Sequence, residues 1–91
     1  MTVRENPEKR RFEAVVDGEV AGSLFYRDTE DGLVLIHTEV DEAFEGRGIG
    51  SRLVAGVLDD VRARGGEVVP ICPFVKRYLE RHPEYADLVA R

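Results

Sequence analysis

The sequence predicts a single α+β domain over residues 1–91, with the element order β-β-β-α-β-α. Three observations support this fold class. Apolar and polar residues alternate in the first part of the chain, around two Asp-Gly pairs that are typical of hairpin turns. An amphipathic helical pattern follows, and a short β-branched segment comes after it. A strand, a helix and another strand in this order form a right-handed crossover, which makes the two strands parallel.

The N-terminal part predicts a hairpin. Residues 1–10 are expected to be a polar lead-in that is partly strand, and residues 11–16 alternate as a strand. Asp17 and Gly18 predict a tight turn, because both central residues of such a turn need a positive φ. The second strand is expected to cover residues 19–27.

A third strand is expected at residues 33–40, after a polar turn. Its first four residues are apolar, as in a central strand that is covered on both faces. The strand becomes polar at His37, Thr38 and Glu39. We therefore expect its C-terminal part to line something other than the core.

The longest helix is expected at residues 49–64, where apolar residues recur at helical spacing. Gly65-Gly66 supplies a left-handed stop for this helix. Gly56 lies inside the helix and costs up to ~1 kcal/mol relative to alanine. This cost predicts a close packing contact at Gly56.

The remaining elements complete a mixed sheet. Residues 67–71 predict a fourth strand, parallel to the third, while the first three strands are antiparallel. Pro73 suits the first position of a helix over residues 73–81. A last short helical segment is expected over residues 84–90.

Composition narrows the class of protein. The chain has 91 residues, 43% hydrophobic residues and a formal net charge of −5. This charge argues against nucleic-acid binding and leaves two alternatives, a cationic partner or solubility alone. The sequence has no apolar run of the ~20 residues that a membrane span needs, and its single cysteine, Cys72, cannot form an internal disulfide. We expect a cytoplasmic protein, a monomer or weak homodimer, without a membrane segment or a metal site.

A glycine-rich stretch precedes the long helix. Gly46, Gly48 and Gly50 alternate with Arg47 and Ile49. Glycine lets a backbone approach a ligand closely, and the first turn of a helix presents unpaired N–H groups and a partial positive charge. The stretch therefore predicts a binding site for a phosphate group.

Two familiar phosphate loops do not match this stretch. A nucleotide P-loop needs a lysine after its last glycine, but Gly50 is followed by Ser51 and Arg52. The dinucleotide fingerprint G-x-G-x-x-G places its third glycine on Ser51 or on Leu53, depending on the register.

The stretch Glu45-Gly46-Arg47-Gly48-Ile49-Gly50 resembles the acyl-CoA motif of the GNAT superfamily of N-acetyltransferases, Q/R-x-x-G-x-G/A. It departs from the motif at Glu45, where the family has Gln or Arg. Residues 36–40, 71–75 and 81–85 extend the resemblance over nearly the full length. The chain is most similar to small GNAT-like acetyltransferases of the YjdJ/NATD type.

The resemblance implies a GNAT-like core in which the third and fourth strands splay apart. It implies that the chain binds acetyl-CoA and transfers the acetyl group to an amine, on a small molecule or on a protein lysine or N-terminus. The residues that it assigns to the donor are Val40, Glu45, Gly46, Arg47, Gly48, Ile49, Gly50, Ser51 and Arg52. Backbone amides of the loop would hold the pyrophosphate, and the Val40 backbone would lie beside the thioester; surface solvation remains the alternative for the two arginines.

Three catalytic candidates follow from the resemblance. His37 is the natural general base, because an amine must lose a proton before it attacks; a structural histidine is the alternative, and Glu39 could serve as base or hold an ammonium group. Cys72 precedes a helix start, which lowers the pKa of a thiol, so it is a nucleophile, a contact of the acyl donor or a packed small residue. Tyr78 is a candidate acid for the leaving thiolate.

A rival function uses the same loop without catalysis. A domain of this size has little surface for an acceptor pocket, so a CoA-binding or protein-interaction module is the alternative to an enzyme.

Overall fold

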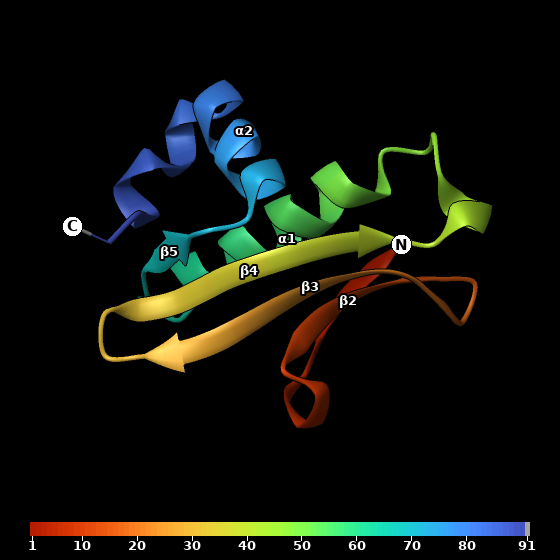
Figure 1. Ribbon diagram of the computed structural model, residues 1–91, viewed down its shortest axis with the longest axis horizontal. Coiled ribbons are helices and arrows are strands. Elements are labelled where there is room, and N and C mark those ends of the chain that lie inside the picture. Colours follow the sequence, from red (N-terminus) through yellow and green to blue (C-terminus); the bar gives the residue numbers. More distant parts are fainter. Residues whose placement is uncertain (91) are drawn as a thin grey trace.

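Five strands lie side by side in the order in which they occur along the chain, and the helices cover one face of the sheet (Figure 1). The computed structural model describes residues 1–90. The strands are β1 (Thr2–Asn6), β2 (Arg11–Val16), β3 (Glu19–Thr29), β4 (Gly32–Val40) and β5 (Val68–Pro70). The helices are α1 (Ile49–Ala63) and α2 (Pro73–Arg81), with 3-10 helices η1 (Pro7–Lys9), η2 (Glu42–Phe44) and η3 (Pro83–Leu88).

The α+β class, the long helix and the parallel final pair are confirmed, but the predicted strand count is wrong. The polar lead-in forms a complete strand, β1, which pairs antiparallel with β2. The sheet therefore has four antiparallel strands and one parallel strand, and the predicted parallel pair of strands three and four is the pair β4 and β5. No residue of β1 is fully buried, and the strand lacks the apolar alternation of its neighbours, which explains the omission.

Hairpin geometry between β2 and β3 follows the prediction. Asp17 and Gly18 have φ values of 49° and 80°, as a tight hairpin turn requires. Two register shifts bend the sheet further along. One lies where β2 passes from Ala14 to Val15, and the other lies where β3 passes from Phe25 to Tyr26, opposite Ile36 of β4. Such bulges increase the local twist and redirect side chains.

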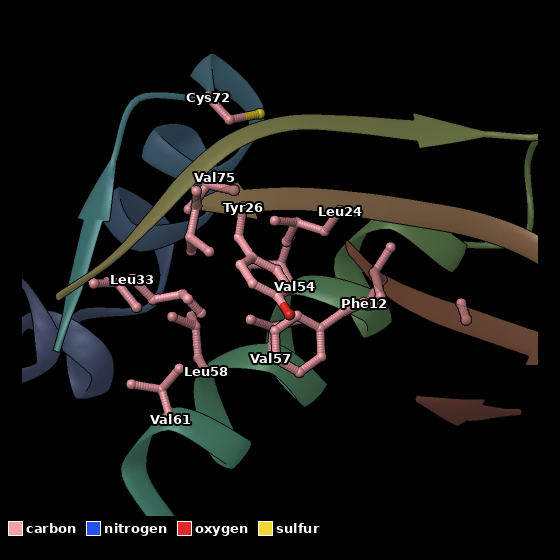
Figure 2. Close-up of a cluster of buried hydrophobic side chains, with 14 of the residues drawn as sticks. Phe12, Leu24, Tyr26, Leu33, Val54, Val57, Leu58, Val61, Cys72 and Val75 are labelled. Carbon is pink, nitrogen blue, oxygen red and sulfur yellow. The ribbon is translucent and has the colours of Figure 1, made fainter. Parts of the chain in front are cut away.

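The core lies between the sheet and α1 (Figure 2). Strand side chains such as Phe12 and Leu24 point toward Val57 and Leu58 of the helix. The apolar stripe of α1 is fully buried at Leu53, Val54, Val57, Leu58 and Val61. Burying each of these side chains stabilises the fold by roughly 1.5–3 kcal/mol.

Strand β1 is held against α1 by a close contact. A Cβ at Gly56 would lie 2.7 Å from a methyl carbon of Val3, so the packing contact predicted at Gly56 is confirmed. Glu5 reaches from β1 to Arg64, beyond the end of α1, at 3.0 Å. The edge strand is therefore fastened to the helix as well as to β2.

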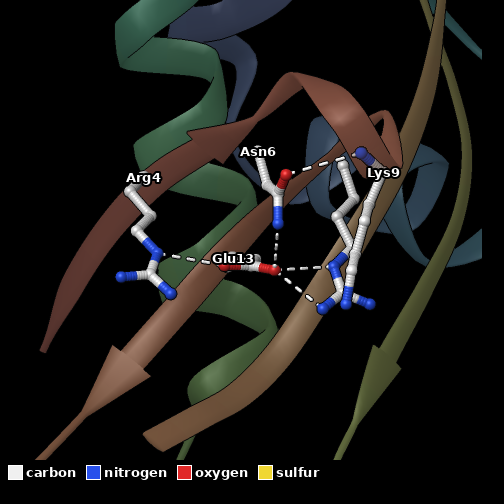
Figure 3. A network of polar contacts seen from close by, with 5 residues as sticks. Arg4, Asn6, Lys9 and Glu13 are labelled. Carbon is white, nitrogen blue, oxygen red and sulfur yellow. Dashed lines mark hydrogen bonds and ion pairs between the residues drawn. The ribbon is translucent and has the colours of Figure 1, made fainter. Parts of the chain in front are cut away.

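The helix-free face of the sheet carries a buried carboxylate (Figure 3). Glu13 is 1% exposed and accepts hydrogen bonds from Arg4 (3.0 Å), Asn6 (3.0 Å) and Arg11 (2.7 Å). Burial raises the pKa of Glu13, but the hydrogen bonds and the positive charge of Arg11 outweigh it and hold the pKa at about 2. Two of the three partners come from β1, so this network also joins β1 to β2.

Within residues 1–90, no helix combines the length and the apolar character that a bilayer crossing requires.

Candidate functional site

Strands β4 and β5 pair only briefly and then diverge. Their register runs from Leu33 with Val68 to Leu35 with Pro70. The N–H groups of Ile71 and Cys72 both donate to the Leu35 carbonyl, at 3.0 and 2.9 Å, and the chain then turns into α2. Beyond Leu35, β4 therefore has no neighbouring strand on its β5 side in the described part of the chain, and its backbone is open there.

The glycine loop stands between the end of β4 and α1. Gly46 and Gly48 have φ values of 81° and 71°, which L side chains rarely adopt, and a Cβ at either would meet no atom within 4 Å. The first hydrogen bond of α1 runs from the N–H of Arg52 to the Gly48 carbonyl, at 3.2 Å. The earlier N–H groups, those of Ile49, Gly50 and Ser51, belong to the unpaired first turn. The loop and the turn together can accept an anion.

Gly50 differs from the other two glycines, because it is buried in the first turn of α1. A Cβ there would lie 2.9 Å from the ring of Phe74 in α2. The absence of a side chain at Gly50 therefore has a packing reason that the alternating glycine pattern does not reveal.

The remaining donor candidates occupy the rim of the loop. Ser51, Arg52, Glu45 and Arg47 are exposed, and the Arg47 guanidinium lies 5.3 Å from the centre of the Phe44 ring. Val40 is half-buried at the end of β4 and packs against the core. Ile49, at the start of α1, is buried in the core.

Cys72 belongs to the core cluster on the helix-covered side of the sheet, and its Sγ shares a hydrogen bond with Thr38 Oγ1 at 3.4 Å. Burial raises the pKa of the Cys72 thiol, but the Thr38 hydroxyl and the backbone groups of Phe74 and Val75 outweigh it, so the pKa lies below its ordinary value. These backbone groups belong to the start of α2, where N–H groups favour a thiolate.

His37 lies on the opposite face of the sheet from Cys72. Thr38 pairs with the core residue Leu24, whereas His37 pairs with Phe25, whose ring stacks on the imidazole at 6.2 Å. His37 is exposed, and its Nε2 is 3.3 Å from Glu39 Oε2. Successive residues of a strand point to opposite faces, so β4 separates the two catalytic candidates.

Tyr78 lies in α2 beside the start of α1. Its ring stacks on His82 at 3.9 Å, and both line a cavity of about 110 Å³ together with Ser51. Burial, followed by the negative charges of Glu84 and Asp59, raises the pKa of Tyr78, which keeps the phenol protonated. The cavity is also lined by Phe74, Arg77 and Arg81.

Several site residues were not identified from the sequence. Thr38 is the direct hydrogen-bond partner of Cys72. The available signal was its position: Thr38 follows His37, so its side chain points to the opposite face of the strand, and it is a polar residue on the apolar face. Arg81 and His82 line the cavity beside Ser51. Their spacing from Arg77 and Tyr78, four residues along a helix, puts each pair on one face.

Two comparisons with known proteins found a match to this chain. The family model of GCN5-related N-acetyltransferases matches residues 11–88. The chain is similar to the solution structure of a GCN5-like protein from Staphylococcus aureus, with a TM-score of 0.71 and 21% sequence identity, over 97% of this chain and 86% of that one. At this identity the likeness establishes the fold. No protein of curated function matches the sequence. The match of the family model over most of the chain shows that this protein belongs to the GCN5-related N-acetyltransferase family.

Proposed function

We propose that the protein transfers the acetyl group of acetyl-CoA to an amine. One observation carries this proposal: the open glycine loop and the unpaired first turn of α1 lie at the end of β4, whose backbone is open after β5 diverges. An anion site next to an open strand edge suits a long donor that carries phosphates at one end and a thioester at the other.

The donor is bound mainly by backbone groups. The N–H groups from Gly46 to Ser51 bind the pyrophosphate. Arg47 lies within the glycine loop and Arg52 lies near the start of α1, so both add positive charge beside the phosphates. The open β4 backbone as far as Val40 pairs with the pantetheine arm. Glu45 is exposed and can turn away from the phosphates, so it does not block this arrangement.

The transfer needs one base and one acid. His37, held by Glu39, accepts a proton from the ammonium group. The neutral amine nitrogen then bonds to the thioester carbon, and the carbon–sulfur bond breaks. The CoA thiolate takes a proton from Tyr78, and the second proton that leaves the amine nitrogen restores the phenol. Cys72 lies on the helix-covered side of β4, away from His37, and contacts the donor in this direct route.

Acetyl-CoA titration by calorimetry tests the loop, with a matched pair of variants. Gly48 and Gly65 both have a φ of +71°, and a Cβ would meet no atom within 4 Å at either. Alanine at each position carries a similar backbone strain of roughly 1–2 kcal/mol. We expect Gly48→Ala to weaken acetyl-CoA binding about 10-fold and Gly65→Ala, at the other end of α1, to leave it unchanged. Absence of binding to the unaltered chain at high micromolar acetyl-CoA would reject the proposal.

Turnover distinguishes the enzyme from the rival module. Acetyl-CoA consumption is measured with a panel of amines, including polyamines and lysine peptides. Tight binding without consumption of any of them would favour a CoA-binding or interaction module.

A further inference from the structure

A hollow lies on the helix-free face of the sheet, and no residue of the glycine loop lines it. It is an open groove of about 480 Å³ where β3 begins and β4 ends. The bulge at Ala21 shapes it, because the Ala21 carbonyl accepts a hydrogen bond from the N–H of Asp41 at 2.8 Å. Its lining consists of Arg11, Val20, Ala21, Gly22, Ser23, Glu39, Val40 and Asp41.

Ser23 is a polar side chain without a partner in this groove. The residue is 5% exposed, and its hydroxyl makes no hydrogen bond within residues 1–90. No side-chain oxygen or nitrogen that is cut off from solvent lacks a partner in this part of the chain, so the Ser23 hydroxyl opens toward the groove. Its cross-strand neighbours are Glu13 and Glu39. Glu13 is already occupied by Arg4, Asn6 and Arg11, so Ser23 is left to accept a bond from a ligand.

The charge available in the groove is negative. Asp41 accepts from the N–H of Ala43 with one oxygen, which leaves the other free. Glu39 is exposed, and its Oε2 lies 3.3 Å from His37 Nε2. Arg11 also lines the groove, but its Nε and Nη2 are directed to Glu13 at 2.7 Å. Two carboxylates and a hydroxyl acceptor, beside a guanidinium that is already bound, are the partners that an alkylammonium group needs.

His37 precedes Glu39, which lines the groove, by two residues on β4. Residues two apart on a strand lie on the same face, about 6–7 Å from one another. His37 and Glu39 therefore lie on one face of β4, and Glu39 connects the proposed base to the groove that Glu39 and Asp41 line. An amine that reacts at His37 can carry a second positive charge into the groove.

We propose that the groove holds a second ammonium group of the acetyl acceptor, so that the preferred acceptor carries two amines a few bonds apart. This inference rests on the proposed acetyl transfer for the identity of the ligand as acceptor. The shared chemistry is a primary alkylammonium, which a free polyamine or a pair of lysine side chains can supply.

Direct binding tests the groove independently of turnover. The chain is titrated with putrescine, with spermidine, with butylamine, and with a short N-acetylated peptide that contains two lysines, and backbone amide shifts are followed by NMR. We expect shifts at residues 21–23 and 39–41, and binding of the diamine at least about 5-fold tighter than binding of butylamine. Shifts confined to other residues, or equal affinity for butylamine and putrescine, would overturn the inference.

A matched set of variants locates the charge. Asp41→Asn keeps the oxygen that caps Ala43 but removes the charge, and Ser23→Ala removes the hydroxyl. Each is expected to weaken putrescine binding about 5-fold. Glu42→Gln is the control, because Glu42 is an exposed neighbour that does not line the groove. It should change putrescine binding less than about 2-fold, because salt screens the attraction between an exposed charge and a ligand that it does not contact. Equal weakening by Glu42→Gln and Asp41→Asn would mean that only overall charge attracts the amine.

These titrations distinguish a free polyamine from a pair of protein lysines, and they test the groove separately from the proposed acetyl transfer. Tighter binding of spermidine than of the peptide names a free polyamine, and the reverse names a protein segment. Diamine binding in the groove without acetyl-CoA binding would reject the proposed function and leave the groove as a cation site. Acetyl-CoA turnover with monoamines, without any diamine preference, would reject the groove alone.

Discussion

The two faces of the sheet are built from different interactions. The face under α1 is apolar, and Leu53 and Leu58 of the helix are fully buried against it. No described helix covers the helix-free face, and its buried polar residues are Ser23 and the carboxylate Glu13, which is enclosed by two arginines and an asparagine. The first face gains free energy from area removed from water, and the second gains it from hydrogen bonds to a charge.

The helix-free face also presents His37, Glu39 and Ser23 to solvent and to the groove. Apolar packing under α1 and polar contacts on the helix-free face are therefore distinct contributions, and the helix-free face also carries the proposed base, His37. Four substitutions test this division, from the largest expected effect to the smallest.

Leu53→Ala should have the largest effect on stability. The side chain is fully buried, so its removal leaves a cavity and should lower the free energy of unfolding by about 2–5 kcal/mol. Urea denaturation at neutral pH measures the loss. Ile71→Ala is the control, because Ile71 is 52% exposed and should change stability by less than about 0.5 kcal/mol. Similar losses for the two variants would contradict the division between the faces.

His37→Ala should lower kcat about 10²-fold, the usual contribution of a general base, and leave stability unchanged. Its side chain is exposed, so little packing is lost. Cys72→Ala, on the other face of β4, should keep at least about a tenth of the activity if transfer is direct. Steady-state kinetics with acetyl-CoA and a diamine measure both. A larger loss for Cys72→Ala would indicate an acetyl-cysteine intermediate, and full activity in both variants would refute both roles.

Glu13→Gln should lower the free energy of unfolding at pH 7 by up to about 2 kcal/mol, because it removes the charge that three donors bind. The folded pKa of Glu13, about 2, lies below its ordinary value of 4.5, so the folded state resists protonation. The contribution is therefore fully present above about pH 4.5 and is lost as the pH falls toward 2. Urea denaturation at several pH values should show the difference between the two proteins shrinking over this range. A difference that stays constant with pH would contradict the ionic role.

Gly50→Ala should have the smallest effect, a loss of about 1 kcal/mol. The added Cβ would meet the Phe74 ring at 2.9 Å, and the ring must move, while alanine recovers part of the loss through its higher helix propensity. Ser51→Ala, at the exposed next position, is the control. Thermal unfolding of both variants measures the effect. A stabilised Gly50→Ala would mean that α2 is not packed tightly on the start of α1.

Much of the fold could be predicted because local signals agree with it. Alternation and the Asp17-Gly18 turn predicted β2 and β3 with nearly their observed ends, and the apolar stripe predicted α1. Strand β1 was predicted only as a polar segment that is partly strand. Its helix-facing positions are Val3 and Glu5, and the charged Glu5, which pairs with Arg64, stands where an apolar pattern would need a hydrophobic residue.

The site was predictable in its backbone and less so in its side chains. The positive φ values of Gly46 and Gly48 agree with the glycine pattern, and family membership supports the reading of that pattern. The separation of His37 from Cys72 depends on the bulge opposite Ile36 and on where β5 ends, and no local sequence signal determines either. The role of each site residue remains a prediction.

The strand order of the sheet bears on how the chain reaches its native state. Neighbours in the sheet are neighbours in sequence, so β1 to β4 can pair through short loops, at a low entropic cost of closure. The resulting meander cannot bury its apolar face until α1 has been synthesised and has docked. We therefore infer that the sheet becomes stable only when α1 docks on it. The first forty residues alone would expose an apolar surface that is prone to aggregation.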